Sequence, residues 1–264
     1  MISVLTVNYH SSPDLALLAE SIRGHQPAEP VELVVTNNSP ADSIRLASDE
    51  RLSVSVEPAR NRGFAAGINA ALRRSQGDIL MVANPDVRVQ AGTLNAAADF
   101  LRRTPDVGLV LPLLRHPEGA IQSSIRRFYT WPVVLYARTP LRWAGFRPGF
   151  FRRYLCEDMD RAVAQPVDWG LGAAMFLRRC DVAPEGVFDE RFFIYFEDVD
   201  LCLRTWRRGL KVFYCPQVEC VHAHRRSSRN PFSLAGRRHV QSLIRFIRKH
   251  GGLPQRPVHS AQQA

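Results

Sequence analysis

Hydrophobic and polar residues alternate along the first 115 residues in blocks that predict a repeating order of strands and helices. Short apolar runs predict strands at residues 2–8, 31–35, 52–56, 79–83 and 107–111. Apolar residues spaced three or four positions apart predict helices between them, at residues 11–25, 64–74 and 91–103. This order is typical of an α/β protein whose parallel sheet is covered by helices on both faces.

Polar turns follow several of the predicted strands. Asn8 ends the first strand, Thr36 and Asn38 lie in the turn after the second, and Asn84 and Asp86 follow the fourth. The carboxyl ends of parallel strands meet at one edge of a sheet, and ligands of such sheets bind beyond that edge. Several turns rich in Asn, Asp and Gly therefore favour a binding site there over ordinary loops.

The regular alternation ends after residue 115. Residues 128–154 interleave aromatic side chains with arginines and prolines. This mixture is typical either of an irregular packed insertion or of an acceptor-binding or membrane-interface element. Further on, Trp169 is followed by the small residues Gly172 and Ala173, which let the backbone approach a ligand closely.

Two more helices are predicted in the second half of the chain. One lies within residues 192–208 and opens at Glu197. The other lies in the basic segment 225–249, and Leu243, Ile244 and Ile247 are expected to form its apolar face.

Composition narrows the partners and the cellular location. The chain carries 35 Lys and Arg residues against 25 Asp and Glu, and Lys211 and Lys249 are its only lysines. Such an arginine excess suits nucleic acid, anionic lipid or a diphosphate substrate, and charge alone does not choose among them. The five cysteines are an odd number without CxxC spacing, which favours a reducing cytosol. Without a signal peptide or a run of about 20 apolar residues, a cytoplasmic protein, soluble or peripheral on a membrane, is expected.

The start of the helix at residues 64–74 is a candidate phosphate site. Asn61, Arg62, Gly63, Gly67 and Asn69 surround it, and a helix N-terminus attracts phosphate through its free N–H groups and its dipole. The segment matches neither the P-loop nor the dinucleotide fingerprint, so an ATPase or a Rossmann dehydrogenase is disfavoured.

Two further constellations are candidates for catalysis. Asp86 lies directly after a predicted buried strand, where a carboxylate could bind Mg²⁺ or Mn²⁺ together with substrate phosphates. His222 and His224 share one face of a predicted strand, and either could complete that metal site. Glu197 and Asp198 follow an aromatic run, and apolar surroundings raise a carboxyl pKa as a general base requires. Capping of the helix is the competing role for Asp198.

Four segments, in this order, resemble the rhamnosyltransferase-like branch of family 2 glycosyltransferases, which have the GT-A fold and build bacterial cell-surface polysaccharides. Residues 61–69 resemble the branch's NxGFaxGxN segment, and residues 84–87 resemble its NPDv variant of the DxD metal motif. Residues 168–175 are similar to the segment before its acceptor site, and residues 188–204 are close to its GFDErFFlYfEDvDLclR signature. The resemblance covers residues 2–228.

The resemblance implies an α/β GT-A domain with a mostly parallel central sheet. It places a nucleotide-sugar-binding half at residues 1–115, an acceptor-binding and catalytic half at 116–228 and a basic helical tail at 229–264. By this resemblance Asp198, next to Glu197, is the catalytic base, and Asp86 with His222 binds the divalent metal, His224 being the alternative ligand. The implied nucleotide-sugar contacts are Asn8, Thr36, Asn38, Asn61, Arg62, Gly63, Gly67, Asn69, Asn84 and Asp86. The implied acceptor contacts are Trp169, Gly172 and Ala173.

The implied activity is inverting transfer of a sugar to a glycan or polyprenyl-diphosphate-linked acceptor, with dTDP-L-rhamnose as the expected donor. The branch usually has Asp at the position of Thr36, so a UDP- or GDP-sugar donor, or an inactive homologue, stays open. The later HxxGxS pattern lacks its glycine at residues 222–227. A basic binding protein, for example one for nucleic acid, is the rival reading, but it leaves Asp86 and Asp198 unexplained. We expect no nucleic-acid partner and a peripheral contact of the basic C-terminal helix with the inner face of the membrane; a homodimer stays open.

Overall fold

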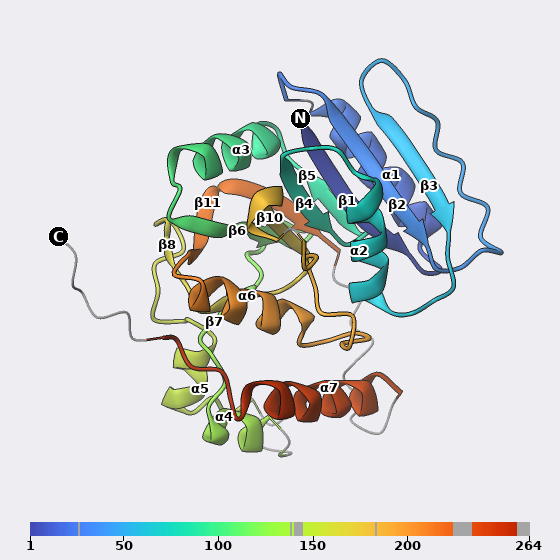
Figure 1. Cartoon of the computed structure of the whole chain (residues 1–264). Helices are drawn as coiled ribbons and strands as arrows, with labels where there is room; N and C mark the ends of the chain where they lie inside the picture. Colours follow the sequence, from blue (N-terminus) through green and yellow to red (C-terminus); the bar gives the residue numbers. More distant parts are fainter. Residues whose placement is uncertain (26, 138, 140–144, 183, 224–233, 258–264) are drawn as a thin grey trace.

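A mixed sheet with helices on both faces forms the centre of the protein. The structure is a computed structural model that describes residues 1–25, 27–137, 139, 145–182, 184–223 and 234–257 (Figure 1). Among these residues, nine strands form the main sheet. Its order is β3 (Ser53–Pro58), β2 (Val31–Asn37), β1 (Ile2–Asn8), β4 (Ile79–Ala83), β10 (Ala174–Arg178), β6 (Val107–Arg115), β11 (Lys211–His222) and β5 (Val87–Val89), and β8 (Gln165–Pro166) pairs with β11.

Strand direction confirms the mostly parallel sheet. β3, β2, β1 and β4 pair in parallel, and β6 pairs in parallel with β11. β10 is antiparallel to both of its neighbours, β4 and β6, and β5 is antiparallel to β11. The sequence did not predict these two strands. Because β10 runs against β4 and β6, it starts at the edge of the sheet where these two strands end. The residues that precede β10 therefore lie beside the carboxyl ends of β4 and β6.

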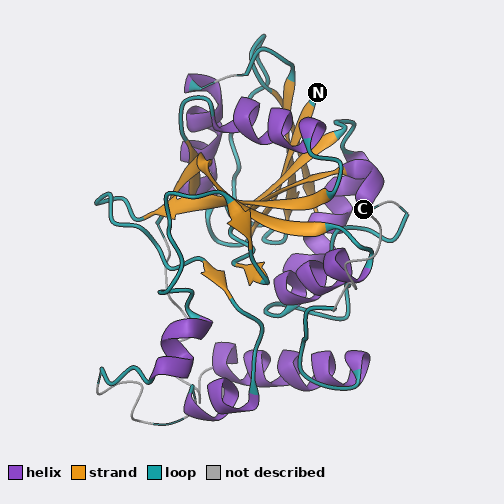
Figure 2. Ribbon diagram, turned by 90° about the vertical axis from the view of Figure 1, so that its left-hand side faces the viewer, coloured by secondary structure: helices purple, strands orange, loops and turns teal. Residues whose placement is uncertain are grey.

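Helices cover both faces of the sheet, as predicted (Figures 1 and 2). α1 (Ser12–Gly24) and α3 (Thr93–Arg103) pack on one face, and α2 (Phe64–Arg74) and α6 (Glu197–Arg207) pack on the other. The bounds of β1, β4 and α2 are those expected from the apolar spacing. Each face therefore has its own apolar core, with the sheet between them.

A further layer lies beyond α6. It contains α4 (Trp131–Tyr136), α5 (Gly149–Tyr154) and α7 (Leu234–His250), which Figure 2 shows on the side of α6 away from the sheet. Between this layer and the sheet, β7 (Ile125–Arg126) pairs with β9 (Trp169–Gly170). The aromatic segment at residues 128–154 is thus partly helical, and its two short helices bury one side and expose the other.

The predicted apolar face of α7 is partly wrong. Leu243 and Phe246 are buried and Ile247 packs against the same core, but Ile244 is 44% exposed. Positions 243, 246, 247 and 250 are spaced by three and four residues, so they share the inner side of the helix. Ile244 lies about a quarter of a turn away from that side, toward solvent.

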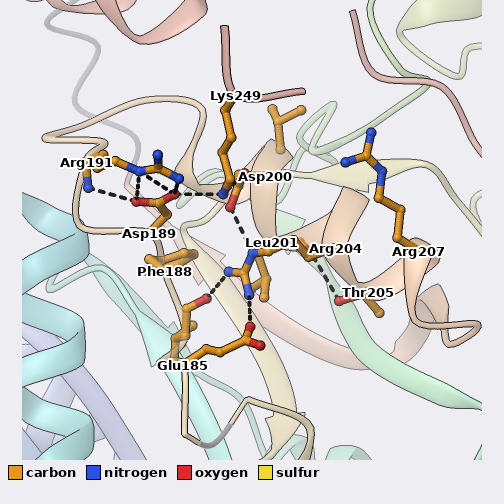
Figure 3. A network of polar contacts seen from close by, with 12 residues as sticks. Glu185, Phe188, Asp189, Arg191, Asp200, Leu201, Arg204, Thr205, Arg207 and Lys249 are labelled. Carbon is orange, nitrogen blue, oxygen red and sulfur yellow. Dashed lines mark hydrogen bonds and ion pairs between the residues drawn. The ribbon is translucent and has the colours of Figure 1, made fainter. Parts of the chain in front are cut away.

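A buried ionic network holds α7 against α6 (Figure 3). The carboxylate of Asp200 is fully buried and accepts hydrogen bonds from Arg204 Nε at 2.9 Å and Lys249 Nζ at 2.6 Å. The same carboxylate lies 2.7 Å from His250 Nε2, and Lys249 Nζ also lies 2.7 Å from Asp189 Oδ2. Burial alone would raise the pKa of Asp200, but His250 and the charges of Arg204 and Lys249 lower it below its ordinary value. The network therefore stabilises the folded chain with Asp200 ionised.

We expect Asp200→Asn to lower the free energy of unfolding by about 3 kcal/mol, because it leaves buried cations without their counter-charge. Urea unfolding at pH 7 measures the change. The matched control is Asp99→Asn, which removes an exposed pair with Arg103 on α3 and should change little. Because the folded-state pKa of Asp200 is lowered, the wild-type advantage should shrink as the pH falls below about 4. An equal loss in both variants would contradict the prediction.

Candidate active site

The strand ends bring the predicted polar turns together at one edge of the sheet. Asn8 pairs with Asn37 at the ends of β1 and β2, and Asn84 follows directly after β4. The N–H of Asn84 donates to the carbonyl of Ala173, just before β10, at 2.8 Å. At the other side, the N–H of Ala223 after β11 donates to the carbonyl of Asp86 at 3.1 Å. The edge is therefore continuous from β2 to β11.

Asp86 and His222 face each other at this edge. Asp86 Oδ1 lies 3.4 Å from His222 Nε2, and both side chains are largely buried. The other ring nitrogen, His222 Nδ1, lies 3.0 Å from Gln122 Oε1. An amide oxygen only accepts, so this contact requires the proton on Nδ1, and Nε2 is the ring nitrogen that faces Asp86.

The donor set at this point fits a divalent cation. A carboxylate oxygen and an imidazole nitrogen are ligands for Mn²⁺, and Mg²⁺ takes one or two carboxylates together with phosphate oxygens. Within the described ranges, no three His, Cys, Asp or Glu side chains gather into a closed metal site. Two protein ligands would leave coordination positions for a diphosphate. His224 lies outside the described residues.

Asp198 is held at the same edge by backbone groups. Its Oδ2 accepts a hydrogen bond from the N–H of Gly172 at 3.1 Å, and its Oδ1 accepts one from the N–H of Val199 at 2.8 Å. A side chain at Gly172 would begin 3.3 Å from Asp198 Cβ, so glycine permits this close approach. Burial raises the pKa of Asp198 to about 6, although both hydrogen bonds act to lower it. Such a carboxyl group accepts a proton more readily than an exposed one and is still ionised at pH 7.

The turn before Asp198 has an unusual backbone. Tyr195 and Phe196 both adopt left-handed conformations, with φ of 69° and 68°. Bulky residues rarely occupy this region, and such strain persists where the surroundings impose it, often at functional sites. The turn starts α6 at Glu197 and points the next residue toward Gly172.

Glu197 is the more deeply buried of the two adjacent carboxyl groups. Its side chain is 6% exposed, and its Oε2 has no hydrogen-bond partner among the described residues. Burial, and next the charge of Asp198, raise the pKa of Glu197 well above its ordinary value. The neutral acid is therefore the form that fits this position, and Asp198 is the better candidate for the base.

The metal candidate and the base candidate are connected through one short segment. Gly172 contacts Asp198, and the next residue, Ala173, bonds to Asn84, two positions before Asp86. The predicted acceptor residues Gly172 and Ala173 thus lie between the two carboxylates. A sugar nucleotide at the edge could meet both carboxylates.

Amide side chains organise the region at the ends of β1 and β2. Asn8 Nδ2 donates to Asn37 Oδ1 at 3.0 Å and to Asp42 Oδ2 at 3.1 Å. The hydrogen bond from Asn8 is the main reason that the pKa of Asp42 is lowered. A hollow of about 310 Å³ opens beside these residues, lined by His10, Ser12, Pro13, Asp42 and Ser43.

Gly63 joins two of the predicted motifs. It has φ of +100°, and a side chain there would begin 2.2 Å from the carbonyl oxygen of Phe193, so only glycine fits. The next residue, Phe64, donates its N–H to that carbonyl at 2.8 Å. Asn61 Oδ1 accepts from the N–H of Gly63 at 3.0 Å, and the carbonyl of Gly63 accepts from Asn38 Nδ2 at 3.3 Å. The start of α2 therefore braces the strained turn that carries the candidate base.

Four residues that were predicted to contact the nucleotide sugar contact other parts of the protein in this structure. Asn69 bonds to both backbone groups of Phe188, at 2.7 and 3.1 Å. Thr36 is buried, donates to the carbonyl of Gly67 at 2.8 Å and accepts from Arg74. A side chain at Gly67 would begin 2.6 Å from Val7, so its glycine lets α2 pack closely on β1. Arg62 is mostly exposed and pairs with Glu190 at 3.3 Å.

Trp169, a predicted acceptor residue, is buried. Its indole N–H donates to the carbonyl of Arg127 at 2.9 Å, and its ring stacks on Tyr129 at 5.5 Å. Tyr129 in turn stacks on Phe196, immediately before Glu197, at 5.3 Å. The contact of Trp169 with an acceptor stays a prediction. In this structure Trp169 supports, through Tyr129 and Phe196, the turn that carries the two carboxyl groups.

Gln122 and Asp42 are site residues that the sequence analysis missed. Gln122 lies in an irregular segment with no motif around it, and only the folded chain brings it to His222. Asp42 lies a few residues after the Asn-rich turn, which was a weak signal that a polar loop continues beyond Asn38.

A family model and several known proteins match this sequence. The family model of glycosyl transferase family 2 matches residues 3–160. The N-acetylglucosaminyl-diphospho-decaprenol L-rhamnosyltransferase of Mycobacterium tuberculosis (strain ATCC 25618 / H37Rv) is 28% identical over 277 residues, covering 98% of this chain and 88% of that protein. Rhamnosyltransferase WbbL of Escherichia coli (strain K12) is 37% identical over 81 residues, 31% of each chain.

Solved structures show the same fold. A structure of GalNAc-T7 with UDP, GalNAc and Mn²⁺ matches with a TM-score of 0.64 and 12% identity over 94% of this chain, which spans 48% of that chain. The mannosyltransferase PcManGT from Pyrobaculum calidifontis, in complex with GDP-Man and Mn²⁺, matches with a TM-score of 0.58 and 19% identity, covering 94% of this chain and 63% of that chain. The chain thus spans about half of the first structure and less than two thirds of the second.

The order of the sheet, with antiparallel β10 beside β4, and these matches identify a glycosyltransferase with the GT-A fold. The family model covers more than half of the residues. The chain belongs to glycosyl transferase family 2.

Proposed function

We propose that this enzyme transfers L-rhamnose from dTDP-L-rhamnose to a polyprenyl-diphosphate-linked sugar, with inversion at the anomeric carbon. The observation that carries the proposal is Asp198, whose pKa is raised to about 6 and whose carboxylate is fixed by Gly172 at the carboxyl edge of the sheet. The Mycobacterium tuberculosis relative, similar over 98% of this chain, supports both the sugar and the acceptor class.

Asp198 acts as the base in this proposal. Its carboxylate accepts the proton of the acceptor hydroxyl, and that oxygen attacks the anomeric carbon from the face opposite the leaving group. Attack in one displacement inverts the configuration. The strained turn at Tyr195 and Phe196 holds the base so that it need not reorganise during the reaction.

Asp86 and His222 hold the divalent cation, Mg²⁺ or Mn²⁺, in this proposal. When bound, the ion neutralises charge that develops on the departing diphosphate. Both structural matches described above were solved with Mn²⁺, which supports a cation at this type of site. Asn8, Asn38 and Asn61 lie on the nucleotide side of the edge in this arrangement.

Gln122 positions His222 for this task. The Gln122 amide is nearly fully buried, its Oε1 faces His222 Nδ1, and its Nε2 donates to the carbonyl of His222 at 2.5 Å. Partners behind a metal-bound histidine fix its tautomer, and their loss commonly weakens metal binding about 10- to 100-fold.

Gln122→Leu should therefore weaken Mn²⁺ binding in the presence of nucleoside diphosphate about 10- to 100-fold. Calorimetry measures the affinity, and ¹⁵N NMR of His222 reports whether Nδ1 loses its fixed proton. The matched control is Gln217→Leu, an exposed glutamine on the same strand as His222. Unchanged Mn²⁺ affinity and an unchanged His222 spectrum would overturn the positioning role.

A transfer assay tests the proposed function. The enzyme, with Mg²⁺ or Mn²⁺, is given a GlcNAc-diphosphate-polyprenol analogue and, in separate reactions, dTDP-rhamnose, UDP-sugars and GDP-sugars. We expect transfer from dTDP-rhamnose. Thr36 stands where the resemblance leads us to expect Asp, and here its hydroxyl bonds within the fold. Transfer from a UDP- or GDP-sugar alone would therefore replace the donor but keep the reaction class. No transfer from any donor would overturn the proposal.

The enzyme works at the inner face of the cytoplasmic membrane in this proposal, because a polyprenyl-linked acceptor resides in a bilayer. None of the helices in the described ranges combines the length and apolar character of a membrane span. The contact is therefore proposed to be peripheral. The assembly state, a homodimer or a monomer, stays open.

A further inference from the structure

Two short helices expose aromatic and apolar side chains on the outer side of the molecule. On α4, Val133 and Tyr136 are buried, whereas Trp131 is 56% exposed and Leu135 is 66% exposed. Positions 131 and 135 are four residues apart, so they share one side of the helix. On α5, Phe151 and Tyr154 face the core, while Phe150 and the preceding Phe146 are exposed. A soluble surface rarely groups so many large apolar side chains without a partner.

Arginines surround these apolar residues. Arg147, Arg152 and Arg153 are exposed on or beside α5, and the sequences of α4 and α5 contain no acidic residue. Glu157 pairs with both Arg147 and Arg152, at 2.8 and 3.2 Å, so one carboxylate serves two guanidinium groups. Arg153 forms no ion pair within the described part of the chain. The surface therefore keeps a net positive charge.

The outer side of α7 has the same character. Arg237, Ile244 and Arg248 are exposed, and their spacing of seven and four residues places them on one side of the helix, turned away from the buried Leu243 and Phe246. The inner cations of α7 are occupied within the fold, because Lys249 pairs with Asp189 and Asp200. Figures 1 and 2 both show α4, α5 and α7 together in the layer farthest from the sheet on this side.

A line of aromatic contacts connects this surface to the candidate base. Phe196, which precedes Glu197, stacks on Tyr129, and Tyr129 contacts Tyr154 at 5.2 Å. Tyr154 contacts Phe151 at 5.7 Å, and Phe151 contacts Tyr136 at 4.7 Å. Tyr136 then meets the exposed Phe150 at 5.8 Å. Packed side chains thus fix the orientation of the surface relative to the active site.

We propose that the outer surface of α4, α5 and α7 docks on an anionic phospholipid bilayer and so presents the active site to a membrane-bound acceptor. Aromatic and leucine side chains enter the boundary between head groups and acyl chains, and arginines bind the phosphates beside them. The choice of a bilayer rests on charge complementarity, since the surface is both apolar and basic. The use of this surface rests on the proposed function, but the docking itself does not require turnover.

Vesicle sedimentation tests the docking directly. The wild-type protein is mixed with vesicles of phosphatidylcholine plus phosphatidylglycerol, or of phosphatidylcholine alone, without any polyprenyl lipid. We expect binding to the anionic vesicles, weaker binding to the neutral ones and a loss of binding as salt rises. Equal binding to both, or no binding to either, would overturn the proposal.

Matched substitutions locate the surface. Arg152→Glu with Arg153→Glu should weaken binding to anionic vesicles more than about 25-fold. Loss of each arginine lowers the affinity about fivefold, and each new glutamate adds repulsion from the anionic lipids. Trp131→Ser with Leu135→Ser should weaken it about tenfold or more. The controls are Arg103→Glu and Leu17→Ser, exposed positions on α3 and α1 at the far side of the sheet. Similar losses in controls and test variants would contradict this surface.

Two further measurements separate the alternatives. Transfer to a short-chain, water-soluble acceptor should be unchanged in all of these variants, because this acceptor does not reside in a bilayer. If the wild-type protein is inactive in this assay, the proposed function is refuted, whereas the docking proposal still depends on the vesicle measurements alone. Thermal unfolding verifies that each variant is folded. If Trp131→Ser with Leu135→Ser converts a dimer to a monomer in sedimentation velocity and leaves vesicle binding intact, the surface is an interface between two copies and the docking proposal is wrong.

Discussion

Asp198→Asn should reduce kcat about 100- to 10,000-fold and leave the affinity for nucleoside diphosphate and Mn²⁺ unchanged. Removal of a positioned general base costs this much in most enzymes. Asparagine keeps the size of the side chain, and its oxygen can still accept from the N–H of Gly172. Steady-state transfer kinetics and calorimetry with nucleoside diphosphate measure the two effects separately. Full turnover in the variant would refute the assignment, and lost nucleotide binding would show a positional rather than a chemical role.

The pH dependence offers an independent check on the same residue. Because burial raises the pKa of Asp198 to about 6, wild-type kcat/KM should rise through a midpoint near pH 6 and level off above it. The raised value also means that ionised Asp198 destabilises the fold, so stability from this group falls as the pH rises from about 4 to about 6. Asp198→Asn should therefore unfold at a higher temperature than the wild type at pH 8. Asp158→Asn, at an exposed position, should keep the wild-type pH profile and the wild-type unfolding temperature.

The positions of Asp198 and Asp86 in the site could be predicted from the sequence. Asp198 follows a hydrophobic run and opens a helix, and local pattern is enough to place such a residue at an apolar edge. Asp86 follows a buried strand, and the direction of parallel strands then fixes the edge at which it lies. Both depend on short-range order, and the structure places both at the carboxyl edge.

Long-range contacts could not be predicted in this way. Gln122 reaches His222 across 100 residues, and Gly63 meets Phe193 across the interface between two motifs. Asn69 looked like part of a nucleotide-binding segment, yet its amide bonds to the backbone of Phe188. A sequence motif indicates which residues belong to one site. Only the packed fold shows which of these residues face the ligand and which hold the other residues in place.

The antiparallel strand β10 was a similar omission. Its sequence, Ala174–Arg178, is a short apolar run like those of the other strands, and nothing local states its direction. That direction decides the geometry of the site, since it brings Gly172 and Ala173 to the carboxyl edge beside Asp198 and Asn84. The helix α7 shows the same limit. Leu243 and Ile247 face inward as predicted, but Ile244 does not, because the pairs of buried Asp200 with Lys249 and His250 also help to set the inner side of the helix.

Asp86→Asn should lower kcat/KM about 1,000-fold. A divalent cation contributes several kcal/mol to charge stabilisation, and each 1.36 kcal/mol changes a rate tenfold. The variant should also bind nucleoside diphosphate with the same affinity in the presence and absence of Mn²⁺. Asp106→Asn, which removes an exposed pair with Lys211, is the control and should keep full activity.

A double-mutant cycle with His222→Ala decides whether the two residues act through one ion. His222 Nε2 lies 3.4 Å from Asp86 Oδ1, so both side chains reach the same point. If one cation joins them, losing either ligand removes most of its effect, and the double variant should be little worse than Asp86→Asn alone. Additive losses, each of 100-fold or more, would mean that the residues act separately. In that case Asp86 alone would hold the cation, and His222 would contribute through a contact that does not depend on Asp86.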